Sequence, residues 1–143
     1  MADNLIQNFL VQQNPTAVTL KAMLDAQATR QRAHAQNIAN AETPGYQRVR
    51  VDFEDMLREK LDGADQTLAR GDQRHVGATD ELDGLTHRVT REPLLEDLTG
   101  VNGVNIEEEM AEMAETQLRY LAALELLRRR YDGMKSAITG NVR

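Results

Sequence analysis

Histidines and carboxylates are the side chains of this chain that could do chemistry. The three histidines, His34, His75 and His87, have neither the spacing of a two-histidine metal site on one helix nor that of a metalloprotease motif. The chain has no phosphate-binding glycine loop, and it contains no cysteine, which excludes thiolate catalysis, thiolate metal sites and disulfide bonds. The sequence therefore predicts no enzyme, no metal centre and no cofactor.

Carboxylates lie close together in the run Glu107 to Glu109. Neighbouring carboxylates can act as general acid and base. At the start of a helix, however, they also complement the positive end of the helix dipole while facing solvent. We interpret this run as a solvated helix start, and we interpret His34, which lies in an alanine-rich segment, as an interface or surface residue.

The composition limits what kind of core the chain can build. Its 143 residues suffice for one ordinary domain, but only two are Phe, three are Tyr and none is Trp. A core must therefore come from Leu, Met, Ile and Ala. The net charge of −6 lies in the middle of the chain, because residues 41–100 carry fourteen acidic and eight basic side chains. Nucleic-acid binding needs a basic stripe, so we expect no nucleic-acid partner.

Targeting signals are also missing from the sequence. Residues 1–10 lack a positively charged region followed by an apolar run, so they do not resemble a cleaved signal peptide. No stretch approaches the roughly 20 apolar residues that span a bilayer. These signals alone predict a cytosolic protein without a transmembrane segment.

Residues 16–40 have the apolar spacing of a helix. Pro15 fits the first helical position, with Asn14 as a favourable N-cap. The apolar stripe consists of Leu20, Leu24, Ala28, Ala35 and Ile38. This stripe is narrow and rich in alanine, so it can hold a partner helix close. Residues 1–13 show spacing compatible with a short separate helix.

The predicted helix must stop before Pro44, because proline disfavours helical geometry in the residue that precedes it. Proline second and glycine third in Thr43 to Tyr46 predict a type II turn, in which Gly45 takes a positive φ. Beyond the turn, Val49, Val51 and Phe53 alternate with charged residues, which predicts an extended, half-buried segment.

A short helix should follow the extended segment, with Asp52 as its N-cap and Gly63 at its end. Residues 62–103 are rich in glycine, aspartate and threonine, and they predict a loop-rich acidic middle. Within it, His87 to Val89 could form a strand.

The C-terminal segment carries the strongest periodic signal in the chain. Its heptad seam, at alternating steps of four and three, consists of Ile106, Met110, Met113, Gln117, Tyr120, Leu124, Leu127, Tyr131, Met134 and Ile138. Asn105 is a suitable N-cap, and Glu108 completes a pattern close to a capping box. This seam predicts a coiled-coil helix roughly 50 Å long, which needs partners.

Together these segments predict a mainly α fold in which long N- and C-terminal helices pair as a coiled coil. We expect residues 1–40 with 104–143 to form this terminal-helix domain, residues 41–61 the turn, extended segment and short helix, and residues 62–103 the loop-rich middle. One function open to such a fold is that of a cytosolic helical adaptor or chaperone-like dimer that binds partner helices.

A second reading comes from the stretch Asn37 to Tyr46 followed by Val51 to Phe53. It resembles the N-terminal signature of the bacterial flagellar axial proteins, the rod and hook family. The C-terminal segments Glu109 to Met113, Gln117 to Tyr120 and Met134 to Ile138 are similar to those of its proximal rod members. The short middle leaves no room for the large β-rich insertion of distal rod and hook proteins.

This resemblance implies a structural subunit of the proximal rod of the flagellar basal body, a helical tube that crosses the periplasm. It implies export through the flagellar type III apparatus without a cleaved signal. The implied partners are copies of the chain, other rod proteins, the junction protein between rod and inner-membrane ring, and export-gate proteins. The implied motif residues of the junction are Asn37, Ile38, Asn40, Thr43, Pro44, Gly45 and Tyr46. Of these, Asn37, Asn40 and Tyr46 are expected to satisfy the helix end or to meet a neighbouring subunit.

Overall fold

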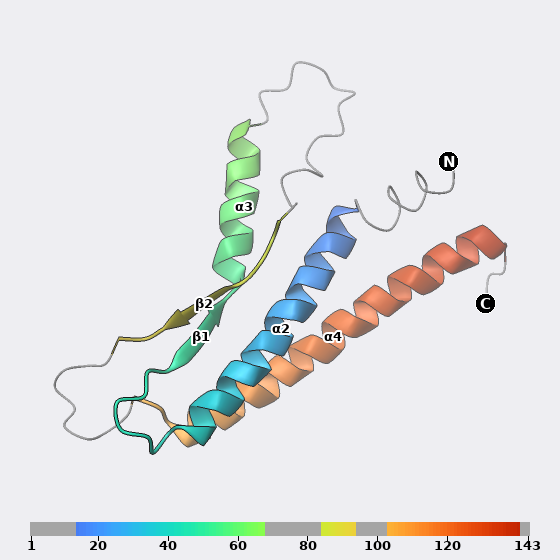
Figure 1. The fold of residues 1–143 in the computed structure, drawn as a ribbon. Coiled ribbons are helices and arrows are strands. Elements are labelled where there is room, and N and C mark those ends of the chain that lie inside the picture. Colours follow the sequence, from blue (N-terminus) through green and yellow to red (C-terminus); the bar gives the residue numbers. More distant parts are fainter. Residues whose placement is uncertain (1–13, 68–83, 94–102, 141–143) are drawn as a thin grey trace.

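The computed structural model describes residues 14–67, 84–93 and 103–140, and it confirms the mainly α fold (Figure 1). The elements, in chain order, are α2 (Pro15–Ala39), β1 (Val49–Asp52), α3 (Glu54–Thr67), β2 (Arg88–Arg91) and α4 (Ile106–Thr139). The helix expected within residues 1–13 lies outside the described residues.

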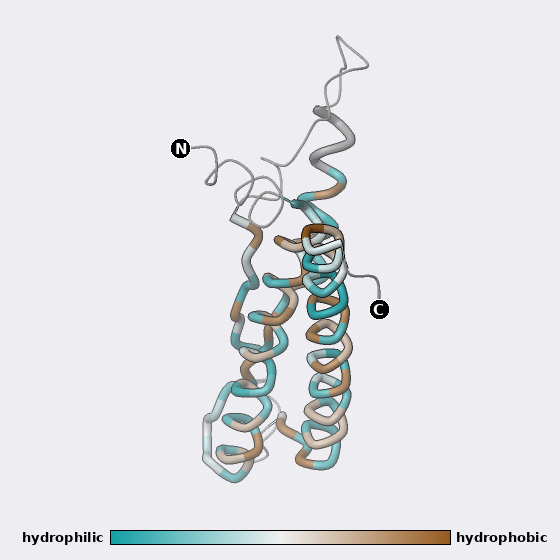
Figure 2. The backbone as a smooth tube through the Cα atoms, turned by 90° about the vertical axis from the view of Figure 1, so that its right-hand side faces the viewer, coloured by the Kyte–Doolittle hydropathy of each residue, from teal (hydrophilic) through white to brown (hydrophobic). Residues whose placement is uncertain are grey.

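The two long helices, α2 with 25 residues and α4 with 34, pack side by side in opposite directions (Figure 1). The predicted pairing of the terminal helices is therefore confirmed. Hydrophobic and hydrophilic residues alternate along this pair and do not gather at one end (Figure 2). None of the described helices is both long and apolar enough to cross a membrane.

Capping side chains fix the start of both long helices. Asn14 Oδ1 accepts a hydrogen bond from the backbone N–H of Thr16 at 3.1 Å, and Pro15 occupies the first helical position. Asn105 Oδ1 accepts from the backbone N–H groups of Glu107 at 3.0 Å and Glu108 at 3.4 Å. Both predicted N-caps are confirmed, since each satisfies N–H groups that lack a partner within the helix.

The turn after α2 also has the predicted form. The backbone N–H of Tyr46 donates to the carbonyl of Thr43 at 3.1 Å, and Gly45 has φ +74°. These are the hydrogen bond and the positive third-position φ of a type II turn. The chain therefore leaves α2 in a defined direction and enters β1.

β1 pairs antiparallel with β2, and Val51 lies opposite Val89. The alternation seen in the sequence puts Val51 and Phe53 in the interior. Phe53 packs with Ala26 of α2 and with Leu85, which precedes β2. The strand expected at His87 to Val89 exists, but it runs from Arg88 to Arg91.

Two predictions about the short helix were wrong. Asp52 does not cap α3, because it belongs to β1, where its carboxylate accepts a hydrogen bond from Thr90 Oγ1 at 3.3 Å. The helix begins with the hydrogen bond from Leu57 N–H to the Phe53 carbonyl. It also continues through Gly63 to Thr67, since a glycine inside a helix costs only about 1 kcal/mol and does not stop it.

Candidate functional site at the helix–turn junction

Asn37, near the end of α2, is 1% exposed and uses every hydrogen-bonding position of its amide. Its Nδ2 donates to the carbonyl of Val49 at 2.9 Å and to Oε2 of Glu109 at 3.1 Å. Its Oδ1 accepts from the backbone N–H of Val49 at 2.8 Å and from the hydroxyl of Tyr46 at 2.9 Å. One side chain thus joins α2, the turn, β1 and α4.

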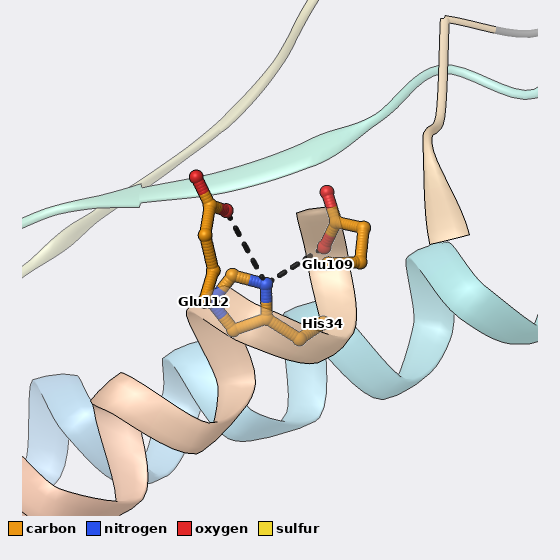
Figure 3. A group of neighbouring side chains, drawn as sticks. All are labelled: His34, Glu109 and Glu112. Carbon is orange, nitrogen blue, oxygen red and sulfur yellow. Dashed lines mark hydrogen bonds and ion pairs between the residues drawn. The ribbon is translucent and has the colours of Figure 1, made fainter. Parts of the chain in front are cut away.

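Glu109, in the first turn of α4, is a carboxylate with 0% exposure. Its Oε2 lies 2.7 Å from Nδ1 of His34 (Figure 3), and its Oε1 accepts a hydrogen bond from Nε of Arg48. Burial alone would raise the pKa of Glu109, but the hydrogen bonds from His34, Arg48 and Asn37 outweigh burial and hold this pKa below its usual value. The carboxylate is therefore ionised and fully partnered. We call Asn37, Tyr46, Arg48, Glu109 and His34 the junction network.

His34, Glu109 and Glu112 bring their possible ligand atoms within 4.8 Å of one another, a spacing that a metal ion could use (Figure 3). Arg48 already supplies the positive charge there, since its guanidinium bonds Glu109 and lies 2.7 Å from Oε2 of Glu112. The guanidinium offsets one of the two carboxylate charges without a metal, and Asn37 donates a further hydrogen bond to Glu109. The geometry favours a structural role for this cluster.

A second ion pair ties α2 to the start of α3. Arg30 donates from Nη1 to Oε1 of Glu54 at 2.7 Å and from Nη2 to Oε2, while its Nε donates to the Val51 carbonyl at 3.1 Å. The hydrogen bond from Arg30 is the main reason why the pKa of Glu54 falls to about 2. A bidentate pair of this kind fixes orientation as well as distance.

A cavity of about 460 Å³ lies beside these pairs, between α2, β1 and α4. Its four arginines are already paired within the chain: Arg30 with Glu54, Arg48 with Glu112, Arg50 with Glu92 and Arg119 with Glu115. The cavity thus presents closed ion pairs and no activated nucleophile among its lining residues. It gives no support for catalysis.

Comparison with known proteins identifies the family. Residues 24–47, which include Asn37 and the turn, match the family described as "Flagella basal body rod protein". The chain is 32% identical over 127 residues to the flagellar basal body rod protein FlgB of Escherichia coli (strain K12), covering 82% of this chain and 89% of the relative. The chain belongs to the FlgB family.

Two further relatives extend this result. FlgB of Cereibacter sphaeroides is 36% identical over 113 residues, covering 78% of this chain and 84% of the relative. FlgB of Bacillus subtilis is 26% identical over 125 residues, covering 87% and 94%. Membership in the FlgB family confirms the resemblance, gives the chain a structural role in the flagellar basal body rod, and associates it with no known enzyme family.

The stability of this FlgB-family chain should be sensitive to acid. Glu54 and Glu109 both have pKa values lowered by folding, so their stabilising contribution is complete above about pH 4.5, the usual glutamate value, and is lost as the pH falls toward 2. We expect the melting temperature to drop across this window. Replacing Glu54 with Gln should reduce that drop.

Thermal melting followed by circular dichroism at a series of pH values measures this effect. Glu59→Gln, which changes an exposed glutamate on the same helix, serves as the control and should leave the acid dependence unchanged. If Glu54→Gln and Glu59→Gln melt with the same pH profile, the Arg30 to Glu54 pair does not contribute to acid sensitivity.

The structure places the residues of the family motif in two groups. Asn37 and Tyr46 meet in the junction network, whereas Pro44 and Gly45 lie exposed in the turn. Asn40 belongs to the end of α2, where its Nδ2 donates to the Gln36 carbonyl at 2.8 Å. Thr43 donates to Asn40 Oδ1 at 3.4 Å, and Ile38 is half-buried. Whether any of these residues contacts a neighbouring subunit stays a prediction.

The N-terminal stripe is only partly covered within the chain. Leu20, Leu24, Ala28 and Ile38 are half-buried, and Ala35 is exposed. The buried residues of α2 are Ala17, Ala26, Gln27, Ala33 and Asn37. Because most of these side chains are small, they allow other elements to approach α2 closely.

The C-terminal seam is divided between two environments. Met113, Tyr120, Leu127, Tyr131 and Met134 are half-buried, whereas Ile106, Met110, Gln117, Leu124 and Ile138 are exposed. The buried positions of α4 are Glu109, Thr116 and Ala123, spaced seven residues apart. The hydrogen bonds to Glu109 hold this line of α4 toward the interior. Each of these buried positions is therefore the residue immediately before an exposed position of the predicted seam.

Sequence reasoning missed the junction network apart from Asn37 and Tyr46. It treated Glu109 as solvated together with Glu107 and Glu108. One available signal was the spacing of Glu109, Thr116 and Ala123, a second heptad line of a charged, a polar and a small residue. Polar and small residues at heptad spacing allow a partner helix to pack closely on that side, and such a contact can bury a charged residue of the same line.

Proposed function

We propose that this chain is a structural subunit of the proximal rod, which assembles through its terminal helices into a helical tube crossing the periplasm. The observation that carries the proposal is the exposure of large apolar side chains along α4. They are Ile106, Met110, Leu118, Leu121, Leu124, Leu126 and Ile138. Exposed apolar surface of this extent on one helix is typical of an interaction site.

The contacts of such a subunit are heterologous, because a helical tube requires one surface to bind a different surface of the next copy. Its proposed partners are copies of itself, other rod proteins, the junction protein of rod and inner-membrane ring, and export-gate proteins. We propose that it reaches the periplasm by flagellar export without a cleaved signal. FlgB-family membership supports these assignments.

The junction network has a defined task in this proposal. It holds α2, the turn and β1 on the start of α4 through Asn37 and Glu109. The helix pair and the strand pair are thereby oriented as one unit. A subunit that meets several neighbours needs this orientation to be fixed.

Replacing Gly45 with Val tests whether the turn matters for assembly. No heavy atom lies within 4 Å of a side chain added there, so the change acts through φ +74°, which costs an L-residue about 1 to 2 kcal/mol and a branched one more. We expect the Gly45→Val chain to be exported while rods and swimming motility are strongly reduced. The chain content of purified basal bodies and swimming in soft agar measure this.

Gly133→Ala is the matched control, because it also adds a side chain where nothing lies within 4 Å, but inside a helix that favours alanine. It should swim normally. If the Gly45→Val chain builds rods at normal levels, the turn is an ordinary loop that assembly does not require. Basal bodies from the source cell that lack this chain would refute the rod proposal and favour the adaptor-like dimer.

A further inference from the structure

The two edges of the small sheet differ in how their backbone groups are used. Just outside the paired strands, the N–H of Glu92 donates to the carbonyl of Arg48 at 2.9 Å. In an antiparallel ladder such bonded pairs alternate with pairs whose backbone groups point away from the partner strand. The residues with outward N–H and C=O groups are therefore Val49 and Val51 in β1 and Val89 and Arg91 in β2.

Side chains of α2 close the edge of β1. Asn37 bonds both the N–H and the carbonyl of Val49, and Arg30 donates to the next outward carbonyl of this strand. The edge of β2 has no such cover, because the outward groups of Val89 and Arg91 make no hydrogen bond with any residue that the structure describes. β2 thus presents an open strand edge.

The side chains along this edge are apolar at one position and basic at two. Val89 is 54% exposed and lies directly opposite the buried Val51, so the apolar row of the sheet continues to the open edge. Arg88 and Arg91 are both exposed, and neither forms an ion pair with a residue in the described part of the chain.

The acids of the sheet leave these arginines uncompensated. Asp52, which pairs with Arg88 in the ladder, accepts a hydrogen bond from Thr90 Oγ1 at 3.3 Å. Glu92 bonds Nη1 of Arg50 at 3.5 Å. The open edge therefore combines free backbone groups, one exposed valine and two positive charges that have no partner within the described residues.

We propose that the edge of β2 binds an extended acidic segment of another protein, which joins the sheet as a third, antiparallel strand. Backbone bonds to Val89 and Arg91 supply affinity, and side chains supply specificity. Directly opposite side chains share a face, so the segment carries an acid opposite Arg91, an apolar residue opposite Val89 and an acid opposite Arg88. The inference goes beyond the rod role and does not rest on it.

Two features limit what this edge accepts. A second copy of β2 is a poor occupant, because it would gather two uncompensated arginines from each chain along one seam. Pro93 follows β2 and has no N–H to offer, so recognition is confined to a short stretch. Short strands and charged side chains are also how proteins prevent unspecific pairing at an edge. The expected contact is therefore weak, reversible and selective for acid.

NMR titration of the full-length chain with a synthetic peptide tests the proposal. The probe is the capped peptide Gly-Thr-Glu-Thr-Val-Glu-Thr-Gly, and its control carries Lys in place of both Glu. We expect the acidic peptide, at millimolar concentration, to shift the amide signals of Val89 and Arg91 most. The amide of Thr90 points toward β1 and should shift much less. The lysine peptide should bind at least about fivefold more weakly.

A proline substitution separates backbone recognition from side-chain contact. Proline is tolerated on an edge strand where its missing N–H faces solvent, so Val89→Pro removes one outward donor and keeps the ladder with β1. Its matched control, Val89→Ala, also loses the valine side chain but keeps the N–H. We expect Val89→Pro to bind the acidic peptide at least about fivefold more weakly than Val89→Ala, with an unchanged circular dichroism spectrum.

Charge reversal is a second test that does not depend on proline. The double variant Arg88→Glu with Arg91→Glu should prefer the lysine peptide to the acidic one. Arg58→Glu changes an exposed arginine of α3 and should keep the natural preference. The reversed preference should be clearest at low ionic strength, where exposed charges are least screened.

Four results would overturn the proposal. They are no binding of the acidic peptide, equal binding of both peptides, equal binding by Val89→Pro and Val89→Ala, and an unreversed preference in the double variant. If the Val89 amide signal shifts with protein concentration in the absence of peptide, a second copy occupies the edge, and the proposal is also wrong. None of these results bears on the presence of the chain in the rod.

Discussion

Replacing Glu109 with alanine is expected to lower the free energy of unfolding by about 3 to 5 kcal/mol, because the change leaves buried partners without their charge. Glu109 is inaccessible to solvent and bonds Arg48, His34 and Asn37. Without it, the Arg48 guanidinium keeps only its weaker and more exposed acidic neighbours. The Asn37 amide also loses one acceptor.

Thermal and denaturant unfolding, followed by circular dichroism, measure the loss. For a domain of this size it corresponds to a fall in melting temperature of more than about 10 °C. Glu108→Ala removes an exposed glutamate from the neighbouring position, and its effect should stay within about 0.5 kcal/mol. If the Glu109→Ala and Glu108→Ala variants have the same melting temperature, the junction network does not stabilise the fold.

The large expected effect follows from how little else is buried among the residues that the structure describes. The buried apolar residues are Ala17, Ala26, Ala33, Val51, Phe53, Leu85 and Ala123. The largest fully buried side chains are polar, namely Gln27, Glu109 and Asn37. With four alanines in the apolar set, the hydrophobic contribution per side chain is small. Directional bonds at one end of the helix pair therefore take a larger share of the specificity of the fold.

Features that depend on neighbouring residues were predictable from the sequence. Asn14 and Asn105 cap their helices, and the turn at Gly45 has the predicted φ, because each of these depends on a few adjacent backbone groups. The alternation around Val51 likewise placed one face of β1 in the interior. Local rules decide such features before any tertiary contact forms.

Features that depend on distant residues were not predictable in the same way. Arg48 and Glu109 are 61 positions apart, and nothing near either residue shows that the fold brings them together. The same reason explains Asp52, where pairing of β1 with Thr90 of β2 prevailed over the local capping preference. The sequence also predicted one seam for α4 that differs from the line that is buried, because the apolar residues of α4 are numerous enough to support more than one inward line.

The surplus of apolar positions on α4 fits its assigned family. A helix that packed against one partner would need one seam, yet α4 buries one line and exposes Leu118, Leu121 and Leu124 on another. In a rod subunit, further helices can cover that second line. In the proposed rod, this exposed apolar surface is what permits assembly.

The second large effect is expected from Asn37→Asp. This change keeps the shape of the side chain but removes both donors of the amide. It sets a carboxylate against Oε2 of Glu109 and the carbonyl of Val49, which Asn37 Nδ2 now contacts at 3.1 and 2.9 Å. Two attractive contacts become repulsive, so we expect a loss of at least about 3 kcal/mol at neutral pH, as for other broken buried networks.

The pH dependence of that loss identifies its cause. Protonating the introduced carboxyl removes the repulsion and restores a donor, so the gap in stability between natural chain and variant should narrow as the pH falls from 7 to 5. Asn40→Asp makes the same chemical change three residues away, on a half-buried side chain at the end of α2, and should cost at most about 1 kcal/mol. A gap that does not change with pH would mean that Asn37 acts by packing and not by the direction of its hydrogen bonds.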